Sequence, residues 1–140
     1  MKYLFRKMLI IFLACLCIFA FSSCGDGINS DEAKALIHDF FAAIVAENYD
    51  KAEDFLHPKR PADLETFLLD IEKEEGIDFQ AGMEIEKYTG SSSSLYDSTV
   101  DGSRCEFTIR TIVGDSEVTF TVEIVNNEGG YGIYNLNIDT

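Results

Sequence analysis

Two histidines, His38 and His57, are the side chains of this chain that ordinarily titrate near neutral pH, so they are the first candidates for acid–base or ligand chemistry. His38 stands beside Asp39 within a helical apolar pattern, and we interpret it as a boundary residue of that helix. His57 precedes Pro58 at the end of a predicted helix, where it either bonds terminal carbonyls or reaches the rim of a pocket. The cysteines and spaced carboxylates of a metal site do not accompany them, so we predict no metal and no cofactor.

Cys105 and Tyr134 are the polar groups on the apolar phases of the later predicted strands. A hydroxyl on a buried face needs a hydrogen-bond partner, so Tyr134 either lines a cavity or is a satisfied core residue. No histidine neighbours Cys105 in the sequence, which is typical of a small core side chain rather than a nucleophile. We name His57, Cys105 and Tyr134 as candidate ligand-binding residues, and we predict no catalytic residue.

Glu106 and Glu123 face each other in a predicted hairpin and are the closest arrangement to an acid–base pair. They lie on the polar phase with Arg104 diagonal to Glu123, so we interpret them as part of a solvated ladder of mixed charge. Four serines at residues 91–94 have no base beside them. That run predicts a flexible, solvated connection rather than a catalytic serine.

The first 23 residues have the pattern of an export signal. Lys2, Arg6 and Lys7 precede an apolar run at residues 8–21, which is shorter than the roughly 20 apolar residues that a transmembrane helix needs. We therefore expect cleavage rather than a permanent membrane span.

Residues 21–24, Phe-Ser-Ser-Cys, end this signal with two small residues and a cysteine. They resemble the lipobox of bacterial lipoproteins. The resemblance implies that the thiol of Cys24 is diacylglycerated, that the chain is cut before it, and that the new amino terminus is often acylated, for example with palmitate. Residues 24–29 would then form a lipidated cysteine and short tether. The implied location is the cell membrane, lipid-anchored on the extracytoplasmic side. The alternative is an ordinary signal peptide with Cys24 left over.

The composition is strongly acidic, with 25 Asp and Glu against 11 Lys and Arg, a formal net charge of −14 and a pI of about 4.3. Nucleic acid and bare anionic lipid would repel such a protein, so neither is an expected partner. We expect membrane contact to come from the anchor alone. Cys15 and Cys17 lie within the apolar run and would leave with it. If the remaining Cys24 is a lipid-bearing thioether, Cys105 has no disulfide partner.

Residues 30–140 are predicted to form one domain that begins with three helices. Asn29 followed by Glu32 indicates a capping box for a helix at residues 30–47. Asp50 is the expected cap of a short second helix, which His57 and Pro58 end. A third helix is expected from Pro61 to about Gly76.

From Gly82 onward the apolar period changes from helical to two, which indicates strands. A two-residue turn at Gly114 and Asp115 predicts a hairpin in which Ile109 lies opposite Phe120, Phe107 opposite Val122, and Cys105 opposite Ile124. A turn at residues 126–130 precedes a last strand whose inward residues are Tyr134, Leu136 and Ile138. A short strand at residues 95–100 would bring the total from four to five.

Helices followed by an antiparallel meander indicate an α+β fold, with N-terminal helices packed on a curved sheet. The segment AENYDKAEDFLHP at residues 46–58 and GYGIYNLNI at residues 130–138 resemble the small nuclear-transport-factor-2-like, or cystatin-like, domains of bacterial lipoproteins. The resemblance spans residues 31–139 and implies a cone-shaped domain. That superfamily includes isomerases and cyclases as well as non-catalytic binding modules, so function depends on the site residues.

Three functions remain open from the sequence. The leading hypothesis is a non-catalytic module, held on the membrane through Cys24, that binds a small ligand or an envelope protein. The second is a small isomerase or hydrolase of the same fold, which would need an inward acid or His57 paired with an aspartate. The third is an interacting homodimer in which the open sheet face, carrying Thr108, Thr119 and Thr121, packs on a second copy.

Overall fold

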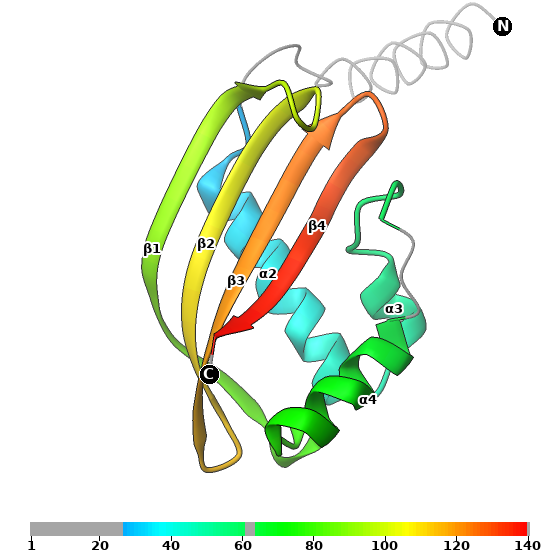
Figure 1. Ribbon diagram of the computed structural model, residues 1–140, viewed down its shortest axis with the longest axis vertical. Helices are drawn as coiled ribbons and strands as arrows, with labels where there is room; N and C mark the ends of the chain where they lie inside the picture. The colour runs from blue at the N-terminus through cyan, green and yellow to red at the C-terminus, as the bar shows by residue number, and fades with distance from the viewer. Residues whose placement is uncertain (1–26, 61–63, 140) are drawn as a thin grey trace, which may run out of the picture.

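The computed structural model describes residues 27–60 and 64–139, which fold as three helices followed by a four-stranded antiparallel sheet (Figure 1). The α+β prediction is confirmed at this level. The elements are α2 (Ser30–Val45), α3 (Tyr49–Glu53), α4 (Leu64–Glu75), the 3-10 turn η1 (Phe79–Ala81), β1 (Met83–Asp97), β2 (Gly102–Val113), β3 (Ser116–Asn127) and β4 (Gly130–Asp139). The predicted signal at residues 1–23, and Cys24 with it, lies outside the described residues.

The start of α2 is set by Asn29, as the sequence pattern predicts. Its side-chain oxygen accepts the backbone N–H groups of Asp31 at 2.9 Å and Glu32 at 3.1 Å, which satisfies two of the free donors at the helix start. The helix ends at Val45 rather than at residue 47, and Glu47 has a φ of +55°, outside the helical region. The apolar stripe of α2 is buried against the sheet.

The cap of α3 is Asn48, so the expectation of Asp50 is wrong. The side-chain oxygen of Asn48 accepts the N–H of Lys51 at 3.2 Å. Asn and Asp are both good N-cap residues. The helix begins at Tyr49, so the N-cap position falls on Asn48 and Asp50 lies inside the first turn. The described part of α4 begins at Leu64, and the helix ends before Gly76, whose φ of +67° favours glycine. The expected start of that helix at Pro61 lies outside the described residues.

The strands pair in the order β1-β2-β3-β4, each antiparallel to the next. The predicted β2–β3 hairpin is confirmed residue by residue, because Ile109 pairs with Phe120, Phe107 with Val122 and Cys105 with Ile124. Gly114, with a φ of +60°, opens the turn. One face of the curved sheet packs across α2, and the other face is open (Figure 1). The described sheet has four strands, within the expected four or five, and residues 95–97 of the possible fifth strand belong to β1.

The serine run at residues 91–94 is not a loop but part of β1. Ser91 pairs with Phe107 and Ser93 with Cys105. Because β1 is an edge strand with exposed side chains, its backbone can pair with β2 without apolar residues. The pairing is interrupted by three register shifts. Such irregularities reduce the ability of an edge to recruit another strand.

Tyr134 does not share the core-facing phase of Leu136, because β4 contains an extra residue at this point. Glu123 pairs with Asn135, whereas the next residue of β3, Ile124, pairs with Ile133. Tyr134 is therefore the bulged residue, and the buried phase passes from Ile133 to Leu136. The predicted alternation of Tyr134 with Leu136 and Ile138 is wrong at Tyr134, whose side chain is half-buried.

Residues 54–60, the segment after α3, cover the outer edge of β4 near its start. Leu56 forms a parallel bridge with Ile133. The backbone N–H of His57 donates to the carbonyl of Ile133 at 2.8 Å, and that of Ile133 donates to the carbonyl of Phe55 at 2.9 Å. This bridge ties the helical layer to the last strand.

The core lies between α2 and the sheet and is rich in phenylalanine. The ring of Phe120 is 5.0 Å from that of Phe41 and 6.3 Å from that of Phe79, measured between centroids. Such aromatic contacts contribute more than their buried area alone. Within the described ranges no helix is both long and apolar enough to cross a bilayer.

Candidate functional site

A cleft of about 420 Å³ opens between the second half of α2 and the start of β1. This volume lies within the range of roughly 300–1,000 Å³ that small-molecule sites occupy. Its walls come from one stripe of α2 and from the first residues of β1. They are His38, Phe41, Ala42, Val45, Met83, Glu84 and Ile85.

The floor of this cleft, the α2–β1 cleft, is apolar and firmly positioned. Phe41 is only 3% exposed and stacks against Phe120 of the core. Met83 and Ile85 are half-buried and pack against the core cluster from β1. An unbranched methionine adapts its shape to a bound molecule more readily than a branched side chain does. The cleft can therefore bury an apolar group without disturbing the fold.

The mouth of the α2–β1 cleft carries its ionisable groups, His38 from α2 and Glu84 from β1. Nδ1 of His38 lies 3.4 Å from a carboxylate oxygen of Asp39, but both side chains are exposed, so solvent screens the pair. The lining residues include no serine, threonine, cysteine or lysine, so His38 and Glu84 are the groups there with acid–base character.

Sequence reasoning missed this cleft because it treated His38 as a boundary residue only. A signal was present, since residues 38, 41, 42 and 45 recur at helical spacing and form one stripe. What the sequence does not reveal is that β1 lies beside this stripe but leaves room for another molecule.

His57 lies away from the α2–β1 cleft and is almost fully buried, with 1% of its surface exposed. Its Nδ1 accepts the backbone N–H of Lys59 at 3.1 Å, so its Nε2 carries the proton and donates to the side-chain oxygen of Asn127 at 3.0 Å. Both ring nitrogens are therefore occupied. Within the described residues its ring nitrogens bond Asn127 and Lys59 rather than the aspartate that the isomerase or hydrolase hypothesis requires. His57 thereby holds the segment after α3 against β3.

Cys105 and Tyr134 lie in two further environments, so the three predicted site residues do not converge on one site. Cys105 is 3% exposed in the core cluster, and burial raises the pKa of its thiol, which disfavours the reactive thiolate. The ring of Tyr134 stacks edge-on against that of His57, with 5.4 Å between centroids. This ring contact joins two of the three predicted residues.

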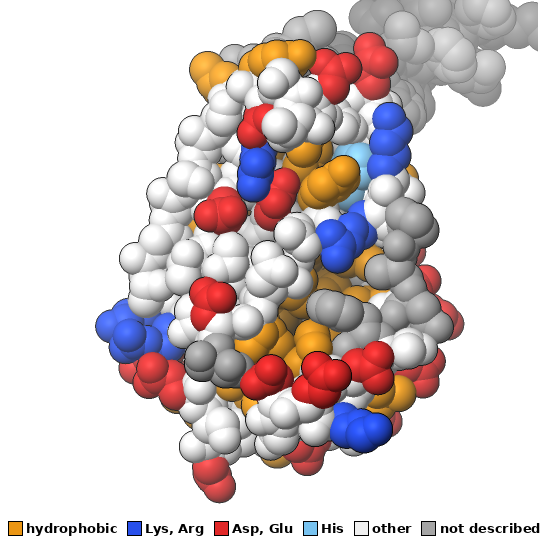
Figure 2. All heavy atoms as spheres, viewed as in Figure 1, with side chains coloured by type: hydrophobic (Ala, Val, Ile, Leu, Met, Phe, Trp, Pro, Cys, Tyr) orange, Lys and Arg blue, Asp and Glu red, His pale blue; other side chains and the backbone are white. Residues whose placement is uncertain are grey.

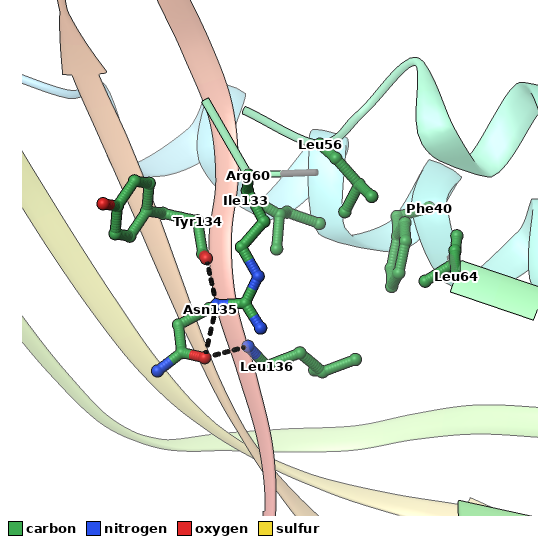
Figure 3. A pocket seen from close by; sticks show the side chains of 8 residues that line it. All are labelled: Phe40, Leu56, Arg60, Leu64, Ile133, Tyr134, Asn135 and Leu136. Atoms are coloured by element: carbon green, nitrogen blue, oxygen red, sulfur yellow. Dashed lines mark hydrogen bonds between the residues drawn. The ribbon is translucent and has the colours of Figure 1, made fainter. Parts of the chain in front are cut away.

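A second hollow lies between β4 and the helices and is shown in Figure 3. Leu56, Ile133 and Leu136 point into it, whereas the Tyr134 ring points away (Figure 3). The Arg60 guanidinium donates to the Tyr134 carbonyl at 2.6 Å and to the Asn135 side-chain oxygen at 2.8 Å. With a volume of about 20 Å³, this hollow holds no more than about one water molecule.

The open face of the sheet carries the carboxylate pair that the sequence predicts, and charged groups are visible across it in Figure 2. Glu106 and Glu123 pair directly across β2 and β3. Arg104 bonds Glu123 at 3.1 Å and lies 3.8 Å from Glu106 and 3.4 Å from Asp97. The mixed-charge ladder is confirmed, but the expectation that it is fully solvated is wrong, because Glu123 is only 8% exposed.

Glu123 belongs to a part of the open face that is shielded from solvent. Glu123, Val125 and Asn127 share the open-face phase of β3, and His57 bonds the last of them. Val125 is fully buried there, which shows that this end of the face is covered. Burial raises the pKa of Glu123, an effect that Arg104 opposes only in part.

Replacing Arg104 with methionine should destabilise the fold by roughly 1–3 kcal/mol at pH 7, because Glu123 would stay buried without its cation. The pKa of Glu123 in the folded protein is raised above its ordinary value of 4.5. Ionisation of Glu123 therefore lowers the free energy of unfolding at pH values above the folded-state pKa. This loss disappears as the pH falls below 4.5, where the carboxyl is protonated in both states. The destabilisation should therefore shrink on acidification. Urea denaturation at several pH values measures it.

The matched control is Arg110→Met on the same face of β2. The acids next to Arg110 are Glu117 and Glu86, which are about half exposed. We expect this change to cost no more than about 0.5 kcal/mol at any pH. Equal losses for the two variants would contradict a special role for the buried Glu123.

Among the described residues, no group of three or more histidine, cysteine, aspartate or glutamate side chains could hold a metal ion. Neither protein-family models nor curated proteins give a match to this chain.

Proposed function

We propose that this protein is a lipid-anchored, extracytoplasmic binding module that holds a small ligand in the α2–β1 cleft. The observation that carries the proposal is the cleft itself, with about 420 Å³ of space over an apolar floor. A concave, mostly apolar site with a few polar groups at its mouth is the usual form of a small-molecule site. The module would act as an accessory to other envelope processes rather than as an enzyme.

The chemistry of the cleft favours a ligand with an apolar body and a neutral or cationic head. Phe41, Val45 and Ile85 would contact the body, and the Glu84 carboxylate at the mouth would accept hydrogen bonds from the head. A carboxylate head would be repelled by the Glu84 carboxylate and by the net charge of −14 on the protein. A simple fatty acid is therefore the less suitable ligand.

The proposed address rests on the sequence of the first 24 residues. The basic start, the apolar run and the cysteine that follows two serines support processing at Cys24. The order of helices followed by an antiparallel meander is compatible with the proposed similarity to nuclear-transport-factor-2-like and cystatin-like domains. We propose that the anchor holds the protein at the membrane and that the domain binds the ligand.

Filling the cleft should abolish binding while leaving the fold intact. Ala42 is exposed on the cleft wall, so Ala42→Trp places an indole in the ligand space without entering the core. We expect at least about a tenfold loss of affinity, equal to roughly 1.4 kcal/mol, for the neutral fluorescent probe N-phenyl-1-naphthylamine. Fluorescence titration of exported residues 25–140 measures this, with 1-decanol, decylamine and decanoate as competitors. The first two should compete better than the third.

The control is Ala35→Trp, since Ala35 is an exposed alanine of the same helix that does not line the cleft. This variant should bind the probe within about twofold of the parent protein. If both variants bind equally well, the cleft is not the site. Native mass spectrometry of the same protein would favour the interaction-module hypothesis if it found a dimer without any added small mass.

A further inference from the structure

Two adjacent apolar side chains are exposed at the end of β1. Leu95 is 77% exposed and Tyr96 is 63% exposed, the two highest values among the large apolar residues described. They immediately precede the turn that leads to β2. Single exposed apolar residues are common, whereas contiguous exposed apolar surface marks protein, ligand or membrane contacts.

This tip lies beside the start of the described chain. A methyl group built on Gly27 would come within 2.6 Å of Cδ2 of Leu95, so the backbone of Gly27 runs directly against that side chain. In Figure 1 the chain enters α2 at the end of the sheet that carries the β1–β2 turn, and the β2–β3 turn lies at the opposite end. Leu95 and the N-terminal side of the domain are therefore neighbours.

The proposed anchor is close to this point. Cys24 precedes Gly27 by three residues, and three residues span at most about 11 Å when fully extended. Acyl chains on Cys24 would thus hold the domain with its β1–β2 tip near the headgroups. Tyrosine and leucine are suited to this layer, where an aromatic ring can lie at the boundary and keep its hydroxyl in a polar environment.

The acidic groups at the tip are engaged by their own neighbours. Asp101 accepts the Tyr96 hydroxyl at 2.9 Å. Asp97 accepts the N–H and hydroxyl of Thr99 and lies 3.4 Å from Arg104. Leu95 is the most exposed large apolar side chain among those described. The carboxylates of Asp97 and Asp101 beside it favour uncharged or zwitterionic lipid over anionic headgroups.

We propose that Leu95 and Tyr96 rest in the interfacial layer of the bilayer that holds the Cys24 anchor, which orients the domain with its β1–β2 tip toward the membrane. The inference rests on the proposed lipid anchor, and it replaces the expectation that the anchor alone contacts lipid. The α2–β1 cleft would then face away from the membrane, because α2 carries the chain about 22 Å from Ser30 to Val45. Ligand would enter from the aqueous phase.

Depth-dependent fluorescence quenching tests this orientation on the full chain, processed in a bacterial host and reconstituted in phosphatidylcholine vesicles. An environment-sensitive dye is attached to Leu95→Cys and, as the matched control, to Asp115→Cys in the β2–β3 turn, each in a Cys105→Ala background. We expect blue-shifted emission for the dye at residue 95, and at least about twofold stronger quenching by spin-labelled lipid than at residue 115. High salt should leave the difference unchanged, because the contact is apolar.

Equal quenching at both positions, in vesicles that float with acylated protein, would overturn the orientation and leave the anchor intact. Absence of acylation and of flotation would overturn the anchor and the orientation together. Energy transfer between two labelled copies at residue 95, without lipid quenching, would assign the tip to a homodimer and also overturn the proposal.

Discussion

Replacing Cys24 with alanine should abolish lipid attachment and release the domain from the membrane. The thiol is the atom that the acyl-bearing group would modify, and alanine offers no nucleophile in its place. Each buried methylene contributes about 0.8 kcal/mol to membrane binding, and stable anchoring takes more than one chain. The loss should therefore be close to complete. Metabolic labelling with a palmitate analogue, followed by membrane fractionation, measures both effects.

The matched control for this experiment is Cys105→Ala. Cys105 is buried in the core, so its replacement should leave labelling and fractionation unchanged. Persistent labelling of the Cys24 variant would contradict the lipobox interpretation. Release without any labelling of the parent protein would instead point to an ordinary cleaved signal peptide. The Leu95 and Tyr96 contact is too small to retain the domain by itself.

Replacing Gly132 with alanine should destabilise the fold by roughly 2–3 kcal/mol, although the change adds a single methyl group. That group would lie 2.6 Å from the backbone nitrogen of His57 and 2.8 Å from the carbonyl oxygen of Phe55. These are the backbone atoms that bond Ile133 across the edge of β4. Because backbone cannot rotate away as a side chain can, the bridge must open. Urea denaturation followed by circular dichroism measures the loss.

Gly90→Ala provides the comparison for this variant. A methyl group at Gly90 on β1 would meet nothing closer than 3.5 Å, the hydroxyl oxygen of Thr108. That is ordinary van der Waals contact, so the change should be neutral or stabilising by up to about 1 kcal/mol through a less flexible unfolded chain. Limited proteolysis should also cut the segment after α3 faster in the Gly132 variant alone. Equal stability of both variants would show that the bridge at Ile133 is not a structural constraint.

The fold and the candidate site were predictable to very different degrees. The capping of α2 by Asn29 and the β2–β3 register follow from residues within a few positions of one another, and both are confirmed. The α2–β1 cleft was not anticipated, because its two walls are about 40 positions apart in the sequence. Of the predicted site residues, His57 and Tyr134 touch each other but lie outside the cleft, and Cys105 is in the core.

Local periodicity was sufficient for the helices, the apolar phases of β2 and β3 and the tight hairpin between them, because each depends on side chains spaced two, three or four residues apart. Only the tertiary structure decided where the fold departs from this periodicity. The bulge at Tyr134 turns its ring away from the core-facing phase. The serine run pairs with β2 as part of the edge strand β1, and Glu123 is buried although it lies on the polar phase. These outcomes depend on which distant segments come together, and a bulge or a covered edge is set by that packing rather than by the residues on either side.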